Sequence, residues 1–319
     1  MNCSNNITES SNLRTVVLLG IPGLEDVYPW ILGIFCLLYI LALIGNCILI
    51  IIIKTDASLQ IPMYDFVSML AITDLGLSLA TIPTVLGVFS IQSLKLPVPL
   101  CLFQMFFIHS FSVMGSSILL AMAYDRFVAI CNPLRYPSLL TRHFVRRLGK
   151  LTVLRSFAVV LPIPIMVQSS LFCNSTVMSH AFCLHPDIMR LLCSNSNTNN
   201  LYSIFAVIFT MGLDAFLIVL SYALILRAVC QLSLVAARWR VFQTCVRHIS
   251  AVLLFYSPMI ILSMIHRFAG RKSTLVHIPM AYLHFLLPPA LNPIVYGIKT
   301  KRIYQSITYS LKRFAKNNV

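Results

Sequence analysis

The sequence predicts an all-α membrane protein: a bundle of seven transmembrane helices with its N-terminus outside, followed by a short amphipathic helix after the seventh span. Composition is the first observation behind this. Hydrophobic residues make up 58% of the 319 residues, charged residues only 10%, and the mean hydropathy is +0.86. A soluble globule of this length could not bury so much apolar surface in one core, so a membrane is the expected solvent.

Apolar runs along the chain are the second observation. Runs long enough for a helix to cross about 30 Å of hydrocarbon cover residues 28–53, 62–88, 101–126, 148–170, 201–228, 243–266 and 275–298. We therefore expect an extracellular N-terminal segment at 1–27, a membrane domain at 28–298, and a cytoplasmic amphipathic helix and tail at 299–319. No basic region precedes the early apolar run VVLLGIPGL, so we expect no cleaved secretory signal.

The uneven distribution of lysine and arginine is the third observation. With the N-terminus outside, six of the 24 basic residues fall on the outer side, and 18 lie at inner loops, inner helix ends and the C-terminal tail. The outer six are Arg14, Lys95, Arg190, Arg267, Arg271 and Lys272. This inner excess sets the orientation. Because the net charge of +15 is divided among short loops, it favours contact with membrane lipid over nucleic-acid binding.

Cysteines and glycosylation sequons agree with this orientation. The outer side holds Cys101, Cys173, Cys183 and Cys193, and the residues alone leave three pairings open. With His180 and His185 the second outer loop could also ligate zinc, but in an extracellular loop we expect disulfides, no metal and no other cofactor. The glycosylation acceptors Asn2, Asn6 and Asn174 lie on the same side.

Helical spacing gathers polar side chains in the outer halves of two spans. One face of the third span carries His109 and Ser112, and one face of the sixth carries Tyr256, Ile260, Ser263 and Arg267. Such faces suit a pocket for a small ligand with a polar head. The Arg267 guanidinium could hold a carboxylate through two hydrogen bonds, supported by Ser263 one turn inward. Alternatively, Arg267 extends into the outer water or pairs with Asp187, and His109 is a hydrogen-bonded histidine of the bundle.

Several motifs occur in a familiar order. Gly45-Asn46 lies in the first span, LAITD in the second, Cys101 opens the third, Asp125-Arg126 closes it, and NPIVY lies in the seventh. This order resembles the rhodopsin-like G-protein-coupled receptors. Within that family, Pro62-Met63-Tyr64, MAYDRFVAICNPLRY, Ser221-Tyr222 and the three-cysteine second outer loop resemble the olfactory receptors. IPGLE at 21–25, FCLHP at 182–186 and His266-Arg267-Phe268 resemble their class I, fish-like branch.

The resemblance implies a plasma-membrane, multi-pass odorant receptor and no enzyme. A small volatile or water-soluble odorant, with a carboxylic acid as one candidate, would activate a stimulatory olfactory G protein and cAMP production. The residues implied in coupling and activation are Asp125, Arg126, Tyr222, Asn292, Pro293 and Tyr296. The family's usual disulfides would join Cys101 to Cys183 and Cys173 to Cys193.

The resemblance also completes the predicted ligand site. It adds His185 as a lid contact and Phe255 beside Tyr256, just before the helix-bending Pro258. The full predicted set is Arg267, Ser263, His109, His185, Ser112, Phe255, Tyr256 and Ile260.

A polar core is predicted near the middle of the second span. Asp74 matches the family's ion-binding acid, and Asn46 is a second polar residue of this region. Asp74 could equally be an ordinary polar residue that is hydrogen-bonded inside the bundle, and we give the two interpretations equal weight. Gly115 stands where class I receptors usually carry glutamate, so the resemblance does not extend to a bound sodium ion.

The helix predicted after the seventh span places Ile303, Ile307, Leu311 and Phe314 at helical spacing among basic residues.

Other function classes fit less well. A secondary transporter would usually show repeated halves with broken helices, and a membrane enzyme would show a phosphate loop, a serine elbow or paired metal-binding histidines. A receptor for metabolites outside the nose stays open as an alternative. An amine receptor would favour an acid where His109 stands.

Overall fold

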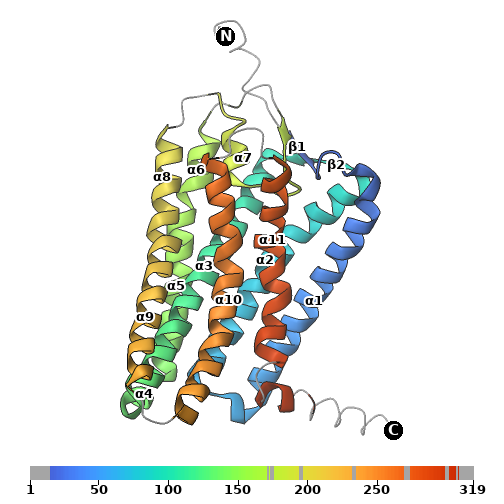
Figure 1. Ribbon diagram of the computed structural model, residues 1–319. Coiled ribbons are helices and arrows are strands. Elements are labelled where there is room, and N and C mark those ends of the chain that lie inside the picture. The colour runs from blue at the N-terminus through green and yellow to red at the C-terminus, as the bar shows by residue number, and fades with distance from the viewer. Residues whose placement is uncertain are drawn as a thin grey trace, which may run out of the picture.

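A computed structural model describes residues 15–170, 172, 176–193, 197–231, 235–268, 274–298, 302–306 and 308. The side chains of residues 235–237, 240, 263–277 and 298 lie outside this description. Seven helical spans in the described chain are long and apolar enough to cross a membrane. The predicted seven-helix bundle is therefore confirmed, and Figure 1 shows the spans side by side.

The first three spans are single helices: α1 (Tyr28–Thr55), α2 (Pro62–Ile91) and α3 (Val98–Cys131). The fourth consists of α5 (Arg142–Val160) and α6 (Pro162–Gln168), and the fifth of α8 (Asn197–Val207), a π-helical turn (Ile208–Gly212) and α9 (Leu213–Cys230). The sixth and seventh are α10 (Val235–Phe268) and α11 (Thr274–Pro293), which a second π-helical turn (Ile294–Ile298) follows. Short elements in the loops are α4 (Tyr136–Leu139), α7 (His185–Met189) and 3-10 turns at Glu25–Val27, Ala57–Leu59 and Pro133–Arg135.

Prolines account for the main irregularities of these helices. A proline ring blocks one backbone hydrogen bond and clashes with the preceding turn. Pro162 accordingly separates α5 from α6, and Pro258 lies inside α10. In α11, Pro293 immediately precedes the second π-helical turn. The sixth and seventh spans therefore both carry local breaks in their hydrogen bonding.

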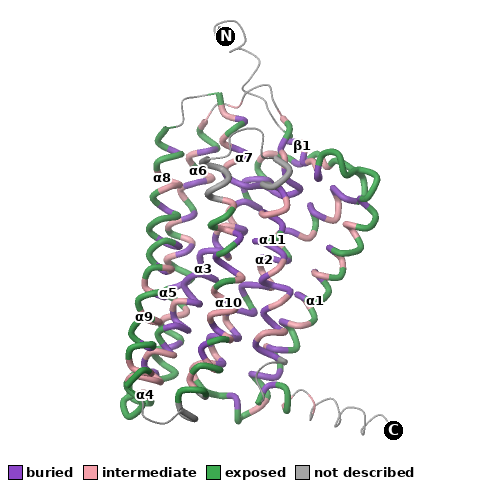
Figure 2. Tube along the Cα trace, in the orientation of Figure 1, coloured by how far each residue is buried: buried purple, intermediate pink, exposed green. Residues whose placement is uncertain are grey.

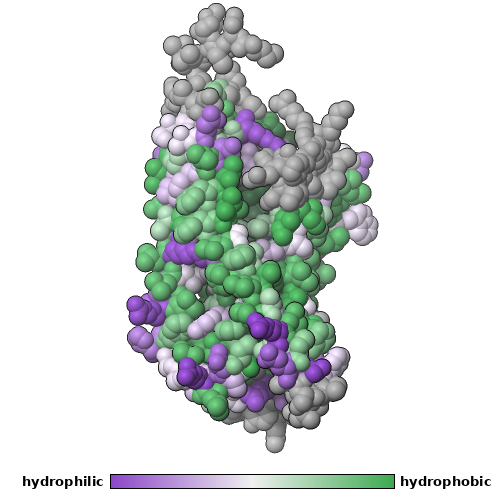
Figure 3. Space-filling view, turned by 60° about the vertical axis from the view of Figure 1, so that its left-hand side comes forward, coloured by the Kyte–Doolittle hydropathy of each residue, from purple (hydrophilic) through white to green (hydrophobic). Residues whose placement is uncertain are grey.

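The third span is the centre of the bundle. In α3, 72% of the apolar window is buried, against 22% in the fourth span. Figure 2 shows exposed residues along the outer faces of the surrounding helices. Many of these are large and apolar, among them Trp30, Leu154 and Val219 at 79%, 66% and 67% exposure. Figure 3 shows a broad apolar surface around the middle of the molecule on the face in view, which fits a surface in contact with lipid tails.

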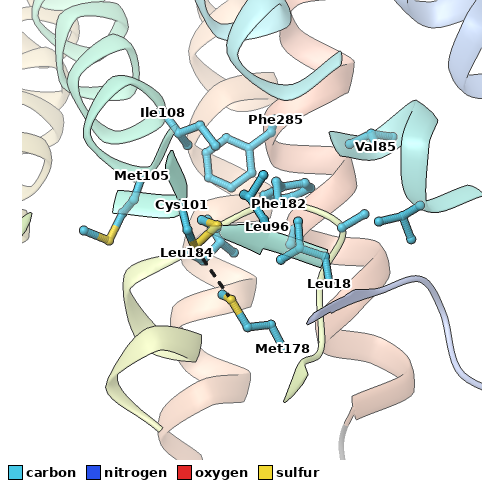
Figure 4. Packing of buried hydrophobic residues seen from close by; sticks show 14 of the residues in the cluster. Leu18, Val85, Leu96, Cys101, Met105, Ile108, Met178, Phe182, Leu184 and Phe285 are labelled. Carbon is cyan, nitrogen blue, oxygen red and sulfur yellow. Dashed lines mark hydrogen bonds between the residues drawn. A yellow bond between two sulfur atoms is a disulfide. The ribbon is translucent and has the colours of Figure 1, made fainter. Parts of the chain in front are cut away.

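Two buried clusters fill the bundle. The outer cluster includes Leu18, Met105, Phe182 and Phe285, and the inner one includes Phe66, Leu119 and Tyr296. Figure 4 shows part of the outer cluster around Cys101 and Phe182. Its members come from the N-terminal segment, α3, the second outer loop and α11, so the loop is packed into the bundle.

A small sheet at the outer end was not predicted. Its strand order is β2-β1-β3, with β1 (Thr15–Leu19) antiparallel to β2 (Ser93–Pro97) and parallel to β3 (Val177–Met178). Val16 and Leu18 of β1 are buried, as the alternation of a half-buried strand requires. Residues 15–19 of the predicted N-terminal segment thus connect the first and second outer loops.

The predicted helix after the seventh span is present at residues 302–306, while Ile307, Leu311 and Phe314 lie outside the described residues. Ile303 is buried, and the Ser306 hydroxyl donates to Asp56 Oδ2 at 2.6 Å. This bond, with those from Ser58, lowers the pKa of the Asp56 carboxyl. The helix is thereby attached to the first inner loop.

Candidate functional site

A cavity of about 610 Å³ opens between the third, fourth and fifth spans beneath the second outer loop. α3 contributes His109 and Val113, and α7 contributes His185 from above. Apolar side chains of α5, α6, α8 and the first π-helical turn form most of the remaining wall, with Asn200 and Ser203 among the polar exceptions. An apolar cavity with a few polar groups is the usual form of a small-molecule site.

Two predicted ligand residues, His109 and His185, both line this cavity. The Nε2 atom of each is buried and has no hydrogen-bond partner among the described residues. Burial lowers the pKa of His185 to about 4, so its imidazole is neutral at physiological pH. A neutral His185 ring has one donor nitrogen and one acceptor nitrogen.

The second outer loop is held over the cavity by covalent and polar contacts. A disulfide joins Cys101 at the start of α3 to Cys183, and the Cys183 backbone N–H donates to Gln104 Oε1 at 3.0 Å. Asp187 of α7 contacts His180 and lies 3.7 Å from Arg190, which also lines the cavity. The residues of α7 that line the cavity are therefore held at fixed positions.

The second predicted disulfide falls partly outside the described chain. Cys193 is disulfide-bonded, while Cys173 lies outside the described residues. The sequons at Asn2, Asn6 and Asn174 also lie outside them. Among the cysteines that the structure describes, five are free thiols: Cys36, Cys47, Cys131, Cys230 and Cys245.

The predicted residues of the sixth span take separate positions. Ile260 is 49% exposed and is not among the described residues that line the cavity. Ser263 and Arg267 lie on α10, but their side chains are outside the description. Phe255 and Tyr256 are buried inside the bundle and are not among the described residues that line the cavity.

Ser112 and Phe255 line a different and much smaller cavity of about 10 Å³, together with Asp74, Gly115 and His284. The Ser112 hydroxyl donates to the Ile108 carbonyl at 2.9 Å. Asp74 is buried and accepts a hydrogen bond of 2.8 Å from Asn292 Nδ2. Four of the predicted ligand residues are thus divided between two places: His109 and His185 line the large outer cavity, and Ser112 and Phe255 line this small one.

Asn46 connects the first and seventh spans. Its Nδ2 donates to the Ala42 carbonyl at 2.8 Å and to the Pro289 carbonyl at 2.9 Å. The neighbouring Gly45 permits this approach, since a Cβ there would lie only 2.8 Å from Pro293 Cβ. Gly45-Asn46 and the NPIVY motif therefore meet at one helix contact.

A buried ion pair is the main feature that the sequence did not predict as a unit. Arg155 of α5 donates from Nη1 to Asp214 Oδ1 of α9 at 2.8 Å, and Asp214 is 1% exposed. Arg155 Nη2 donates to the carbonyls of Phe209 and Thr210 in the π-helical turn, at 3.1 and 3.2 Å. Extra carbonyls in such a turn are available to a side-chain donor. The signal in the sequence was a charge within each of two apolar spans.

Two serines and a tyrosine extend this ion pair across the bundle. Ser116 and Ser117 of α3 donate to Asp214 Oδ2 at 2.9 and 3.2 Å. The Tyr256 hydroxyl lies 2.7 Å from the Ser116 hydroxyl. Because Ser116 donates to Asp214, Tyr256 is the donor in this bond. Tyr256 thereby belongs to a polar network that joins α3, α5, α9 and α10.

At the cytoplasmic end, Asp125 and Arg126 point to different partners. Asp125 is 1% exposed and accepts from the Tyr136 hydroxyl at 2.8 Å. Arg126 Nη2 contacts Met63 Sδ of α2. The partner of Asp125 therefore comes from α4 in the second inner loop, whereas the contact of Arg126 comes from α2.

The two predicted tyrosines near Arg126 are also placed. The Tyr222 hydroxyl lies 2.6 Å from His248 Nδ1, which joins α9 to α10. Tyr296, in the second π-helical turn, is 2% exposed, and its hydroxyl lies 4.0 Å from Met122 Sδ of α3. Pro293, one turn earlier, packs against Gly45. His248 is a member of this region that the sequence did not single out.

Comparisons with known proteins agree with this architecture. Residues 35–313 match the sequence model of the family described as olfactory receptor. The chain is 48% identical to human olfactory receptor 51G2 over 303 residues, covering 95% of this chain and 96% of the relative. It is 46% identical to human olfactory receptor 51G1 over 308 residues (97% and 95%) and 44% identical to human olfactory receptor 52K1 over 314 residues (98% and 99%).

The family model covers most of the chain, and these relatives are similar over nearly their whole length. Together with the seven membrane-spanning helices, they agree with the motifs from Gly45-Asn46 to NPIVY. Olfactory receptors are signalling receptors and not enzymes. The chain belongs to the olfactory receptors, in their class I branch, and is a multi-pass plasma-membrane receptor that senses odorants.

Proposed function

We propose that this receptor recognises small carboxylic acids of short to medium chain length. The observation that carries the proposal is the outer cavity, which His109 lines from α3 and His185 from α7, each with an Nε2 atom that has no hydrogen-bond partner among the described residues. Its apolar walls suit an aliphatic chain, and His109 and His185 suit hydrogen bonds to one end of the molecule.

Arg267 is the proposed anchor for the carboxylate, with Ser263 one turn inward on the same helix. A guanidinium binds a carboxylate through two charge-assisted hydrogen bonds, which are about twice as strong as neutral ones. α10 extends to Phe268 at the end of the bundle where α7 lies (Figure 1). The support for Arg267 is its position on this helix and its charge.

Binding would be transmitted to a stimulatory olfactory G protein and raise cAMP. The proposed coupling residues are those of the inner end: Asp125, Arg126, Tyr222, Asn292, Pro293 and Tyr296. The contacts of Tyr222 with His248 and of Asn292 with Asp74 join neighbouring spans, and a movement of α10 would change the first of them. Such discrete contacts are the usual elements of a two-state receptor.

A cAMP assay tests the proposal in cells that co-express the olfactory stimulatory G protein. The panel would contain carboxylic acids, alcohols and amines matched in chain length. We expect acids to activate, and Arg267→Ala to lower their potency about 10–100-fold, the loss of a charged hydrogen bond. Arg271→Ala is a matched control because it removes an outer arginine four residues away. Equal responses of wild type and Arg267→Ala to each active acid would refute the anchor, and activation by amines alone would refute the ligand class.

A further inference from the structure

Four basic residues form one face of α5 at its cytoplasmic end. Arg146, Arg147 and Lys150 lie three, four and seven residues after His143, so the four side chains lie on the same side of the helix. All four are exposed, and together they line a hollow of about 440 Å³. The rule that basic residues stay on the inner side of the membrane depends only on how many of them lie near a span. It does not explain why these four residues lie on one face of the helix.

The charges of this basic face are not compensated within the described chain. None of the ion pairs in the described residues includes them, and Arg146 makes only a hydrogen bond from Nε to the Arg142 carbonyl. The neighbouring Arg142 is not counted in the basic face, because its Nη2 already donates to Gln60 Oε1 at 2.8 Å. The first turn of α5 contains no acid, although the positive end of a helix dipole favours one there. An anion at this face would therefore relieve repulsion from both the side chains and the helix end.

The basic face is directed away from the protein interior. The buried residues of α5 are Val145, Thr152, Ser156 and Val160, which share the other side of the helix. From His143 to Lys150 the helix rises about 10 Å, which carries the face from the second inner loop into the headgroup layer. Figure 3 shows hydrophilic residues gathered at this end of the molecule, next to the apolar surface.

An apolar groove lies beside the basic face. Phe144, Leu148 and Leu151 of α5 line it together with leucines of α9 and Tyr124 and Phe127 of α3, and its volume is about 710 Å³. Phe144 and Leu151 are 36% and 51% exposed, so the groove opens outward in the membrane. A cationic hollow next to a membrane-facing apolar groove is complementary to an anionic head joined to a hydrocarbon chain.

We propose that this part of the receptor binds an inner-leaflet phospholipid with a multiply phosphorylated headgroup. Its phosphates would lie between His143, Arg146, Arg147 and Lys150, and an acyl chain would lie in the adjacent groove. Several cations at one hollow match several phosphates better than a single one, and arginine binds phosphate through two parallel hydrogen bonds.

Native mass spectrometry of the full-length receptor in detergent tests the site. Phosphatidylinositol 4,5-bisphosphate would be titrated, with phosphatidylserine and soluble inositol 1,4,5-trisphosphate as comparison ligands. We expect the bisphosphate lipid to bind most tightly and Arg146→Gln/Arg147→Gln to weaken it about 25-fold, since each surface cation contributes about fivefold. The soluble headgroup is expected to compete only at much higher concentration, because it lacks the acyl chain that the groove would bury.

Two further variants control for charge and folding. Arg135→Gln/Arg227→Gln removes two exposed cytoplasmic arginines that line neither the hollow nor the groove and is expected to leave lipid affinity nearly unchanged. Arg146→Lys/Arg147→Lys keeps the charge and is expected to retain most of the binding. Equal lipid affinity of wild type and Arg146→Gln/Arg147→Gln, or an equal loss in the Arg135→Gln/Arg227→Gln control, would overturn the site. Full displacement of the lipid by an equal concentration of inositol trisphosphate would show a site for a soluble phosphate instead. If Arg146→Gln/Arg147→Gln kept its lipid affinity but lost cAMP signalling, the basic face would be a G-protein contact instead.

Discussion

Arg155 of α5 binds both carboxylate oxygens of Asp214 of α9, at 2.8 and 3.1 Å, within the membrane-spanning part of the bundle. The same carboxylate accepts from two serines of α3, and one of these contacts Tyr256 of α10. Four spans therefore meet at a single acid. In hydrocarbon neither ion could be left without its partner at low cost, so the pair fixes the relative positions of these helices.

Removing one partner of this ion pair is expected to destabilise the receptor more than removing both. Arg155→Met or Asp214→Leu alone leaves an unpaired buried charge and should lower the free energy of unfolding by about 3–5 kcal/mol. The double variant Arg155→Met/Asp214→Leu should lose less than the sum, because no buried charge is left over. Thermal unfolding of the purified receptors in one detergent measures this. Exposed Arg135→Gln is the control, and additive losses in the double variant would contradict the coupling.

The sequence predicted the spans because their signal is local: a helix must stay apolar for the whole thickness of the bilayer. It did not predict β1, whose partners at 93–97 and 177–178 are distant in the chain. Arg155 and Asp214 were each visible as charges in apolar runs, but 59 positions separate them and nothing local pairs them. Likewise, helical spacing placed Ser112 on the same face as His109, although the structure assigns the two side chains to different cavities.

Gly115 determines the size of the small cavity around Asp74. A Cβ at this position would lie 3.3 Å from Phe255 Cε2, and the cavity has a volume of only about 10 Å³. Gly115→Ala should therefore be tolerated after a small shift of Phe255, whereas Gly115→Glu should displace it and place a second acid near Asp74. We expect thermal stability to fall by several degrees in Gly115→Glu and little in Gly115→Ala. Equal melting temperatures of the two variants would show that the space is larger.

The disulfide between Cys101 and Cys183 closes a loop of 82 residues. By chain entropy, a loop of that length stabilises the folded state by about 4–5 kcal/mol. Cys101→Ala, Cys183→Ala and the double variant should lose this stability equally, since each breaks the same bond. Surface expression and thermal unfolding of the three variants measure it, with the free and exposed Cys47→Ala as a control. A double variant much less stable than either single one would mean that the two thiols act separately.

His185 should make stability depend on pH. Burial lowers its pKa to about 4, whereas an exposed histidine titrates near 6.5. As pH falls below about 6.5, the unfolded chain takes up this proton before the folded receptor does, so protons favour unfolding. The loss accumulates between about pH 6.5 and 4 and then stops, with a total on the order of 3 kcal/mol. His185→Gln cannot titrate and should abolish this part of the pH dependence, which melting temperatures from pH 7 to 4.5 would reveal. The exposed His143→Gln should keep the wild-type slope, and parallel curves for wild type and His185→Gln would refute the assignment.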